Sequence, residues 1–168
     1  MSAEAELRLH RVCFTGHRPE KLSVSERKVM NGLEKKIDEA VADGYRTFIT
    51  GMARGVDIWA AEIIIKKRKK HPELKLICAL PYEGFEQSWS TDWQKRYRTI
   101  LEQADLVKAI SPGYSKACFQ KRNEWMVDHS TRVIAVWNGE PSGTKNTIDY
   151  AHQQGVALKN VLDVYAYD

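Results

Sequence analysis

Apolar residues in this chain fall into short continuous runs, and between the runs they recur at every third or fourth position. Short apolar runs bounded by turn residues are typical of buried strands, whereas the longer period indicates amphipathic helices. The runs predict strands over residues 11–15, 46–50, 74–80, 105–110, 132–137 and 156–164. The periodic segments predict one helix between a capping box at 23–26 and Gly44, and further helices over 56–71, 92–103, 116–129 and 148–154.

Strands and helices alternate along the whole chain, which favours an α/β fold with a mainly parallel sheet. The strands are apolar at nearly every position, as expected where helices cover both faces of the sheet. The sequence therefore predicts a three-layer sandwich. A length of 168 residues fits one domain, 1–168, in which the polar residues 1–8 form a flexible tail.

Composition narrows the classes of partner. The net charge of +4 is compatible with a small anionic ligand and is low for a nucleic-acid-binding arm. The cysteines Cys13, Cys78 and Cys118 form no CxxC pair, and with the five histidines they show no metal-ligand spacing, so we predict no metal site. No secretory signal and no run of about 18 apolar residues is present, so we expect a cytoplasmic protein without a membrane partner.

The segment from Thr47 to Asp57 predicts a strand, a turn bounded by Gly51 and Gly55, and the start of a helix. Backbone N–H groups in the first turn of a helix lack intrahelical partners, and phosphates bind there. Arg54 adds a guanidinium to this turn. The segment is not a Walker A loop, because no Gly-Lys-Ser/Thr follows. An ordinary strand–turn–helix connection is the alternative.

Polar and glycine-rich segments follow several of the predicted strands. In parallel α/β sheets ligands bind at the carboxyl ends of the strands, so residues 17–18, 51–57, 82–89 and 139–147 should converge on one rim. The candidate ligand-binding residues are Gly16, His17, Arg18, Gly51, Met52, Arg54, Gly55, Asp57, Arg122, Gly139, Ser142, Gly143, Thr144 and Thr147.

Individual side chains have more than one interpretation. Arg18 is either a phosphate contact or a solvated loop residue. His17 is a phosphate donor, a structural hydrogen-bonding group or an acid–base residue. Asp57 would repel a phosphate, so a ribose hydroxyl or a backbone N–H suits its carboxylate better. Gly143 and Thr144 open a helix and form a second anion-binding candidate.

Two further clusters remain open at this level. Tyr82, Phe85 and Trp89 either stack on a base or pack a long loop. The basic run 66–70 complements the dipole at the end of its helix, and a nucleic-acid or membrane patch is the alternative.

Four motifs resemble one family. They are Thr15-Gly16-His17-Arg18, the Gly51–Asp57 turn, Arg122-Asn123-x-x-Met126-Val127-Asp128, and Ser142–Thr147. Together they resemble the bacterial YpsA-like family of the SLOG superfamily, which also contains DprA and the LOG phosphoribohydrolases. The resemblance covers about residues 11 to 160 and implies a Rossmann-like fold. It also implies a nucleotide or ADP-ribose-like ligand and self-association as a homodimer.

The comparison with LOG bears on catalysis. Arg122 stands at the position of a catalytic arginine in LOG, where an exposed guanidinium could clamp a phosphate or ribose. Thr147 stands at the position of the catalytic glutamate, and a threonine hydroxyl cannot act as a general base. The resemblance therefore carries over ligand binding and leaves open whether the protein is an enzyme.

The main hypothesis is binding of a nucleotide or ADP-ribose-like ligand at the rim, in the role of a sensor or regulator. The first alternative is an N-glycosidic or phosphoribosyl hydrolase, which would need Asp57, Asp128 or Glu83 near the sugar. The second is a DprA-like nucleic-acid-binding protein, motivated by the run 66–70. That run lies at the end of its helix away from the rim, so we do not expect nucleic acid as a partner.

Overall fold

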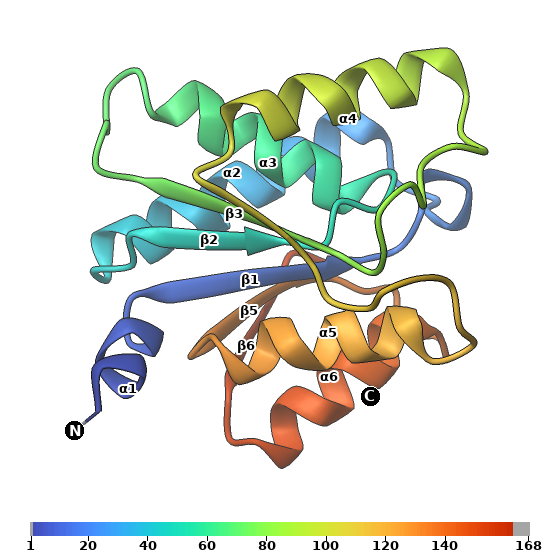
Figure 1. Cartoon of the computed structure of the whole chain (residues 1–168). Helices are drawn as coiled ribbons and strands as arrows, with labels where there is room; N and C mark the ends of the chain where they lie inside the picture. Colours follow the sequence, from blue (N-terminus) through green and yellow to red (C-terminus); the bar gives the residue numbers. More distant parts are fainter. Residues whose placement is uncertain (1, 163–168) are drawn as a thin grey trace.

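Six parallel strands form one sheet in the order β4-β3-β2-β1-β5-β6 within residues 2–162, the part of the chain that this computed structural model describes (Figure 1). The strands are β1 Arg11–Gly16, β2 Thr47–Thr50, β3 Lys75–Leu80, β4 Leu106–Ala109, β5 Arg132–Val136 and β6 Ala157–Asn160. The predicted parallel α/β sheet is confirmed. Positions 163–164 of the last predicted strand lie outside the described residues.

Helices cover both faces of the sheet, as predicted for a Rossmann-like sandwich (Figure 1). One layer contains α2 Glu26–Ala42, α3 Val56–Lys67 and α4 Thr91–Gln103. The other contains α5 Cys118–Asp128 and α6 Gly143–Gln153. A short 3-10 helix, η1 Pro19–Lys21, follows β1.

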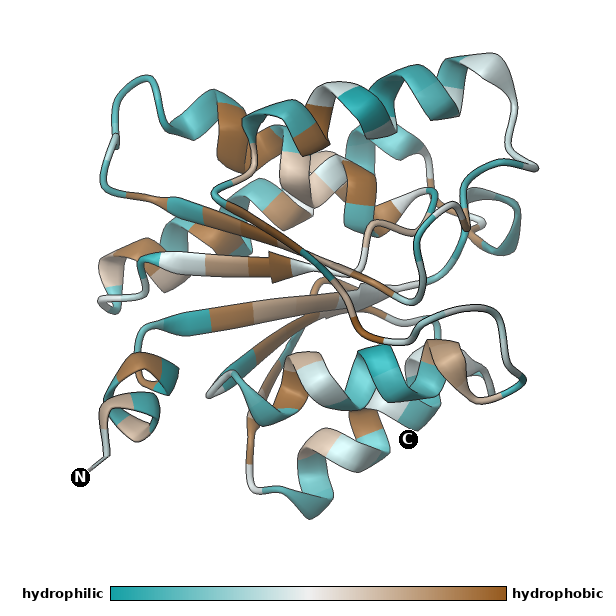
Figure 2. Cartoon of the chain, in the orientation of Figure 1, coloured by the Kyte–Doolittle hydropathy of each residue, from teal (hydrophilic) through white to brown (hydrophobic). Residues whose placement is uncertain are grey.

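Side chains of the central strands point alternately to the two faces of the sheet, so each face has its own hydrophobic cluster beneath a helical layer. In β1, Val12 and Phe14 belong to the cluster beneath α2, α3 and α4, whereas Cys13 belongs to the cluster beneath α5 and α6. All three side chains are fully buried. Successive residues of a strand point to opposite faces, so a strand covered on both faces is apolar throughout. Figure 2 shows brown, hydrophobic segments along the strands and much teal, hydrophilic surface on the helices.

The expectation of burial on both faces fails at β4. All four of its residues are exposed, and Leu106 and Val107 retain 50% and 41% of their accessible surface. The strand order explains the difference, because β4 is an edge strand with β3 as its one neighbour among residues 2–162. The apolar run predicted the strand correctly and could not reveal its place in the sheet.

One helix begins earlier than its apolar period indicates. The apolar period predicts a helix over 148–154, but α6 begins at Gly143, where the anion-site interpretation of Gly143 and Thr144 places a helix start. Ser142 is the N-cap, and its Oγ accepts the Lys145 N–H at 3.1 Å. Because the helix starts at Gly143, soon after the end of β5, its first turn lies directly at the rim of the sheet.

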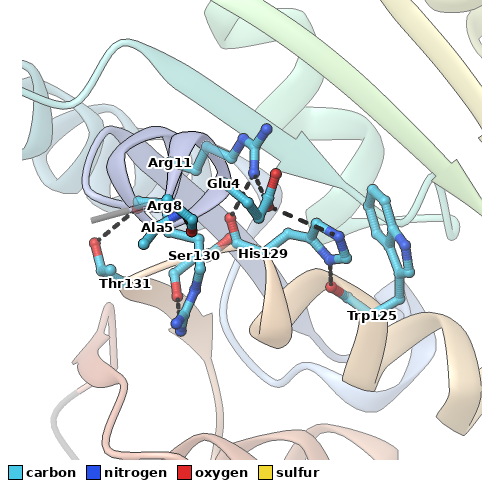
Figure 3. A network of polar contacts seen from close by, with 9 residues as sticks. Glu4, Ala5, Arg8, Arg11, Trp125, His129, Ser130 and Thr131 are labelled. Atoms are coloured by element: carbon cyan, nitrogen blue, oxygen red, sulfur yellow. Dashed lines mark hydrogen bonds and ion pairs between the residues drawn. The ribbon is translucent and has the colours of Figure 1, made fainter.

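Most of the segment 1–8, which we expect to form a flexible tail, is helical in the structure. Residues Ala3–Arg8 form helix α1, which is held by polar contacts with the β1 and β5 region (Figure 3). Arg11 Nη1 contacts Glu4 Oε1 at 2.6 Å, and Arg8 Nη2 donates to the Ser130 carbonyl at 3.1 Å. The partner of Arg8 lies more than a hundred positions along the chain, so local polarity alone could not predict this contact.

We predict that Gly16→Ala destabilises the fold. A Cβ at Gly16 would lie 2.5 Å from Cγ2 of Val56, so the end of β1 and the start of α3 would have to separate. Overpacking of this kind costs about 1–3 kcal/mol in the free energy of unfolding, measured by urea denaturation. Gly113→Ala is the control, because its Cβ would meet no atom within 4 Å. Equal stability of the two variants would contradict the close contact.

Candidate functional site

A cavity of about 450 Å³ lies at the carboxyl ends of β1 and β5. The chain passes from β1 to β2 on one side of β1, while β5 lies on the other side. Such a change of direction is where ligands bind in open α/β sheets. We call this the rim cavity.

Eight predicted site residues line the rim cavity, and six do not. Those that line it are Gly16, His17, Arg18, Asp57, Arg122, Ser142, Gly143 and Thr144. Those that do not are Gly51, Met52, Arg54, Gly55, Gly139 and Thr147.

The N-terminus of α6 opens on the rim cavity. Gly143 and Thr144 line it and belong to the first helical turn, whose backbone N–H groups have no intrahelical acceptor. A Cβ at Gly143 would meet no atom within 4 Å, so the backbone there is open to another molecule. The partial positive charge of the helix end therefore faces the cavity, as an anion site requires.

The turn before α3 is less open than its glycines suggest. Gly55 has φ 91°, and a Cβ there would lie 2.8 Å from Pro19 Cδ and 3.2 Å from the His17 carbonyl oxygen. The Ala53 N–H already donates to Asp57 Oδ2 at 3.2 Å. The turn is thus covered by η1, and one of its backbone N–H groups is already bonded to the carboxylate of Asp57. The turn therefore contributes Ala53 and Asp57 to the lining of the rim cavity and does not present a row of unbonded backbone N–H groups.

Two other residues of this turn have structural contacts. Met52 is fully buried and adopts φ 62°, which is uncommon outside glycine. Gly51 lies against Arg122, and a Cβ there would be 2.8 Å from the guanidinium carbon. The glycine is needed for the close approach of an arginine from α5, not for the approach of a ligand.

Arg122 is buried, which corrects the expectation of an exposed guanidinium. It retains 4% of its accessible surface; Nη1 donates to the Gly51 carbonyl oxygen, and Nε donates to Asn123 Oδ1 at 2.8 Å. Burial lowers the pKa of the Arg122 guanidinium, and the charge of Asp57 opposes that shift. Arg122 therefore joins α5 to the β2–α3 turn and also faces the cavity.

Asp57 has one carboxylate oxygen without a partner. The side chain is 6% exposed, and Oδ1 has no hydrogen bond within the described part of the chain. Burial raises the pKa of Asp57 to about 6, and the charge of Arg122 and the Ala53 N–H hold it from rising further. Buried acceptors normally have a hydrogen-bond partner, so this unpaired oxygen marks Asp57 as a candidate site residue.

His17 joins two sides of the rim. Its Nε2 accepts the Asn138 N–H at 3.2 Å, so the proton of the neutral ring is on Nδ1. Burial lowers the pKa of His17, which keeps the ring neutral at pH 7. Of the three interpretations of this residue, the structural hydrogen bond is the one with an observed contact.

Arg18 and Lys21 bring positively charged side chains to the rim cavity, and Glu140 brings a carboxylate of opposite charge. The Arg18 side chain is 59% exposed, and its Nε is 3.9 Å from Glu20 Oε1, so it can turn toward a ligand. Arg54, a candidate ligand-binding residue, does not line the rim cavity. Its Nη2 lies 2.9 Å from Glu20 Oε1, and its side chain lines a neighbouring cavity.

Thr147, at the position of the LOG glutamate, points into the protein. Its side chain is 1% exposed, and Oγ1 donates to the Gly143 carbonyl oxygen at 3.0 Å. The hydroxyl is thus used inside α6 and does not line the rim cavity.

Several lining residues were not among the candidate ligand-binding residues, including Lys21, Ala53, Phe119, Asn123, Asn138, Glu140 and Pro141. Phe119 lies one turn before Arg122 on α5, and residues at that spacing share a helix face. Helical spacing could therefore have identified Phe119. Lys21 reaches the cavity because it lies in η1, and no periodic pattern in the sequence indicated that helix.

Two classes of feature are absent from residues 2–162. These residues contain no group of three or more His, Cys, Asp and Glu side chains that could hold a metal ion. None of their helices is both long and apolar enough to cross a membrane.

We predict that Arg122→Ala weakens folding as well as the site. Removing the guanidinium leaves the Gly51 carbonyl without its donor and takes away the charge that acts on Asp57, which should cost about 1–3 kcal/mol in the free energy of unfolding. In a double-mutant cycle with Asp57→Asn, urea unfolding should show a coupling of about 1–3 kcal/mol. The exposed Arg98→Ala is the control and should change stability by less than about 0.5 kcal/mol. Strict additivity of the two substitutions would contradict the electrostatic coupling.

Comparison with solved structures identifies proteins with a similar fold. The chain superposes on DNA processing protein A (DprA) from Streptococcus pneumoniae with a TM-score of 0.67 and 19% identity, covering 96% of this chain and 54% of that protein. The molybdenum cofactor binding protein from Rippkaea orientalis gives a TM-score of 0.57 at 19% identity, over 92% of this chain and 77% of that protein. At these identities the likeness shows the fold alone.

Sequence relatives are closer. The SPbeta prophage-derived protein YoqJ of Bacillus subtilis is 38% identical over 138 residues, which cover 74% of this chain and 80% of YoqJ. A UPF0398 protein of Ligilactobacillus salivarius is 31% identical over 162 residues, covering 92% of this chain and 86% of that protein. Residues 12–166 match the YpsA family, whose description is YspA SLOG family. The resemblance carried by the four motifs is thereby confirmed, and the chain belongs to the YpsA SLOG family.

Proposed function

We propose that the rim cavity binds the phosphate of a nucleotide or ADP-ribose-like ligand, and that the protein acts as a sensor or regulator of that ligand. The observation that carries the proposal is the open N-terminus of α6 at Gly143, on the same cavity as the unpartnered Oδ1 of Asp57. A helix N-terminus binds anions, and a buried carboxylate oxygen accepts a hydroxyl. A ribose phosphate supplies both groups in one molecule.

The remaining charges support an anionic ligand. Arg18 and Lys21 can close over a phosphate from the β1 side, and Arg122 adds a fixed positive charge from α5. The carboxylates of Asp57 and Glu140 oppose a bare phosphate, and Asp57 would favour the sugar end of the ligand. The cavity volume of about 450 Å³ is within the range of small-molecule sites.

Two proteins with the same fold are described with different ligands. The Helicobacter pylori DprA is described as binding single-stranded DNA, and the Rippkaea orientalis protein as binding a molybdenum cofactor. The rim geometry of this chain favours a small ligand, because the basic run 66–70 lies at the far end of α3.

Calorimetric titration tests the binding proposal. We expect AMP or ADP-ribose to bind, and Arg18→Ala to weaken binding by about ten- to a hundredfold through loss of a charged hydrogen bond. Because Arg18 is largely exposed, its truncation should leave the melting temperature without ligand unchanged. Arg98→Ala, on the exposed surface of α4, is the matched control. Absence of binding by any nucleotide or ADP-ribose derivative at millimolar concentration would overturn the proposal.

A second candidate function, N-glycosidic hydrolysis, is favoured by one observation. Of the three carboxylates that could replace the LOG glutamate, Asp57 lines the rim cavity, and its pKa of about 6 suits a general acid. Asp128 instead accepts a hydrogen bond from the Tyr150 hydroxyl at 2.7 Å on the far part of α5. Glu83 does not line the rim cavity.

We expect little turnover, because Thr147 cannot replace the glutamate and its hydroxyl is already bonded within α6. Chromatography of nucleoside monophosphates after incubation should show base release slower than about 1 s⁻¹. Faster release that Asp57→Asn abolishes and Asp128→Asn preserves would establish the hydrolase in place of the sensor.

A further inference from the structure

A second cavity adjoins the rim cavity, and the two share Arg18, Ala53 and Phe119. It has a volume of about 610 Å³. Its aromatic lining consists of Tyr82, Phe85, Trp89, Trp93 and Phe119. We call it the aromatic cavity.

Phe119 is the aromatic residue that lines both cavities. The Arg122 guanidinium carbon lies 5.9 Å from the centroid of its ring, on the side of the rim cavity. Tyr82 and Phe85 of the aromatic cavity have ring centroids 6.3 Å and 6.4 Å from that of Phe119. One turn of α5 thus presents a guanidinium to one cavity and an aromatic ring to both.

The aromatic side chains differ in what they already contact. Phe85 is 8% exposed and packs edge-to-face on Trp89 and Tyr97, with centroid distances of 5.2 Å and 5.8 Å. This ring holds the loop together. Phe119 is 41% exposed, so part of its apolar surface remains in water. An open ring at the mouth of a cavity is available to another planar group.

Positive charge accompanies the open ring. Arg18 lines both cavities and is largely exposed, and Arg54 lines the aromatic cavity beside its partner Glu20. Aromatic faces combined with arginines are the groups that bind bases and the phosphates attached to them. An exposed aromatic ring alone, or an arginine alone, does not distinguish a ligand site from loop packing. The lining residues that the two cavities share connect the aromatic cavity to the anion site at the start of α6.

We infer that the aromatic cavity is the base subsite of the same ligand whose phosphate occupies the rim cavity. This inference rests on the proposed function. The ligand class is a single nucleotide or a nucleoside diphosphate derivative, with its base on the Phe119 side of the aromatic cavity and its phosphate at the start of α6. Arg18, which borders both cavities, contacts the part of the ligand that joins them.

Paired titrations with ribose 5-phosphate and AMP test the inference, because the two differ in the base. The intact protein should bind AMP at least about tenfold more tightly than ribose 5-phosphate, the effect of one stacked base. Phe119→Ala should remove this difference by weakening AMP much more than ribose 5-phosphate. Phe119→Leu, which keeps apolar volume without an aromatic face, should behave like the alanine variant and guards against a folding defect.

Tyr114→Ala is the matched control. Tyr114 contacts the same aromatic group, with its ring centroid 6.0 Å from that of Tyr82, but it lines neither cavity and is 72% exposed. It should leave both affinities unchanged. Equal binding of AMP and ribose 5-phosphate by the intact protein, or an unchanged ratio in the Phe119 variants, would overturn the base subsite while the proposed function stands.

Two other results would also overturn the inference, and they differ in what they imply. If neither compound nor ADP-ribose binds the intact protein, the proposed function fails together with the subsite. If a single-stranded oligonucleotide binds more than about tenfold tighter than AMP at physiological salt, the aromatic cavity serves a nucleic-acid strand and not a single nucleotide.

Discussion

The candidate site depends on one buried guanidinium. Arg122 reaches from α5, in one helical layer, to the carbonyl of Gly51 at the end of β2, and its charge acts on Asp57 at the start of α3 in the other layer. Burying an arginine is costly unless its charge is compensated and its N–H groups are bonded. The contact requires a glycine at position 51, because a side chain there would occupy the place of the guanidinium. The rim is therefore built around a charged contact, unlike the apolar layers beneath it.

This arrangement explains how neighbouring groups at the rim acquire different properties. Burial raises the pKa of Asp57 to about 6, while it keeps His17 neutral by lowering the pKa of the ring. Both effects disfavour charge at fixed, buried positions. The charges that remain adaptable belong to Arg18 and Lys21 at the mouth of the cavity. The rim cavity thus combines buried groups that have fixed contacts with cations whose side chains are exposed.

The sequence predicted the sheet and its layers because apolar runs and helical periods are local signals. Eight of the fourteen candidate residues also line the rim cavity, because the carboxyl ends of neighbouring parallel strands converge at one edge of a sheet. The sequence could not predict that Arg122 is buried, because that depends on an approach between α5 and Gly51, 71 positions apart in the chain. The same limit applies to α1, whose Arg8 contacts the Ser130 carbonyl across the chain. Covering of the Gly55 turn by Pro19 is likewise a tertiary contact that no turn motif reports.

The open edge at β4 has a consequence for how this protein behaves at high concentration. An edge strand with unpaired backbone groups is a template on which another extended segment can add, and Leu106 and Val107 make this edge apolar. Lys108 is the charged residue within the strand, and its Nζ lies 5.6 Å from the Trp125 ring centroid on the α5 side. A lysine on a short edge is a common natural protection against intermolecular β-pairing. At the β4 edge, protection against pairing with another extended segment therefore depends on the ammonium group of Lys108.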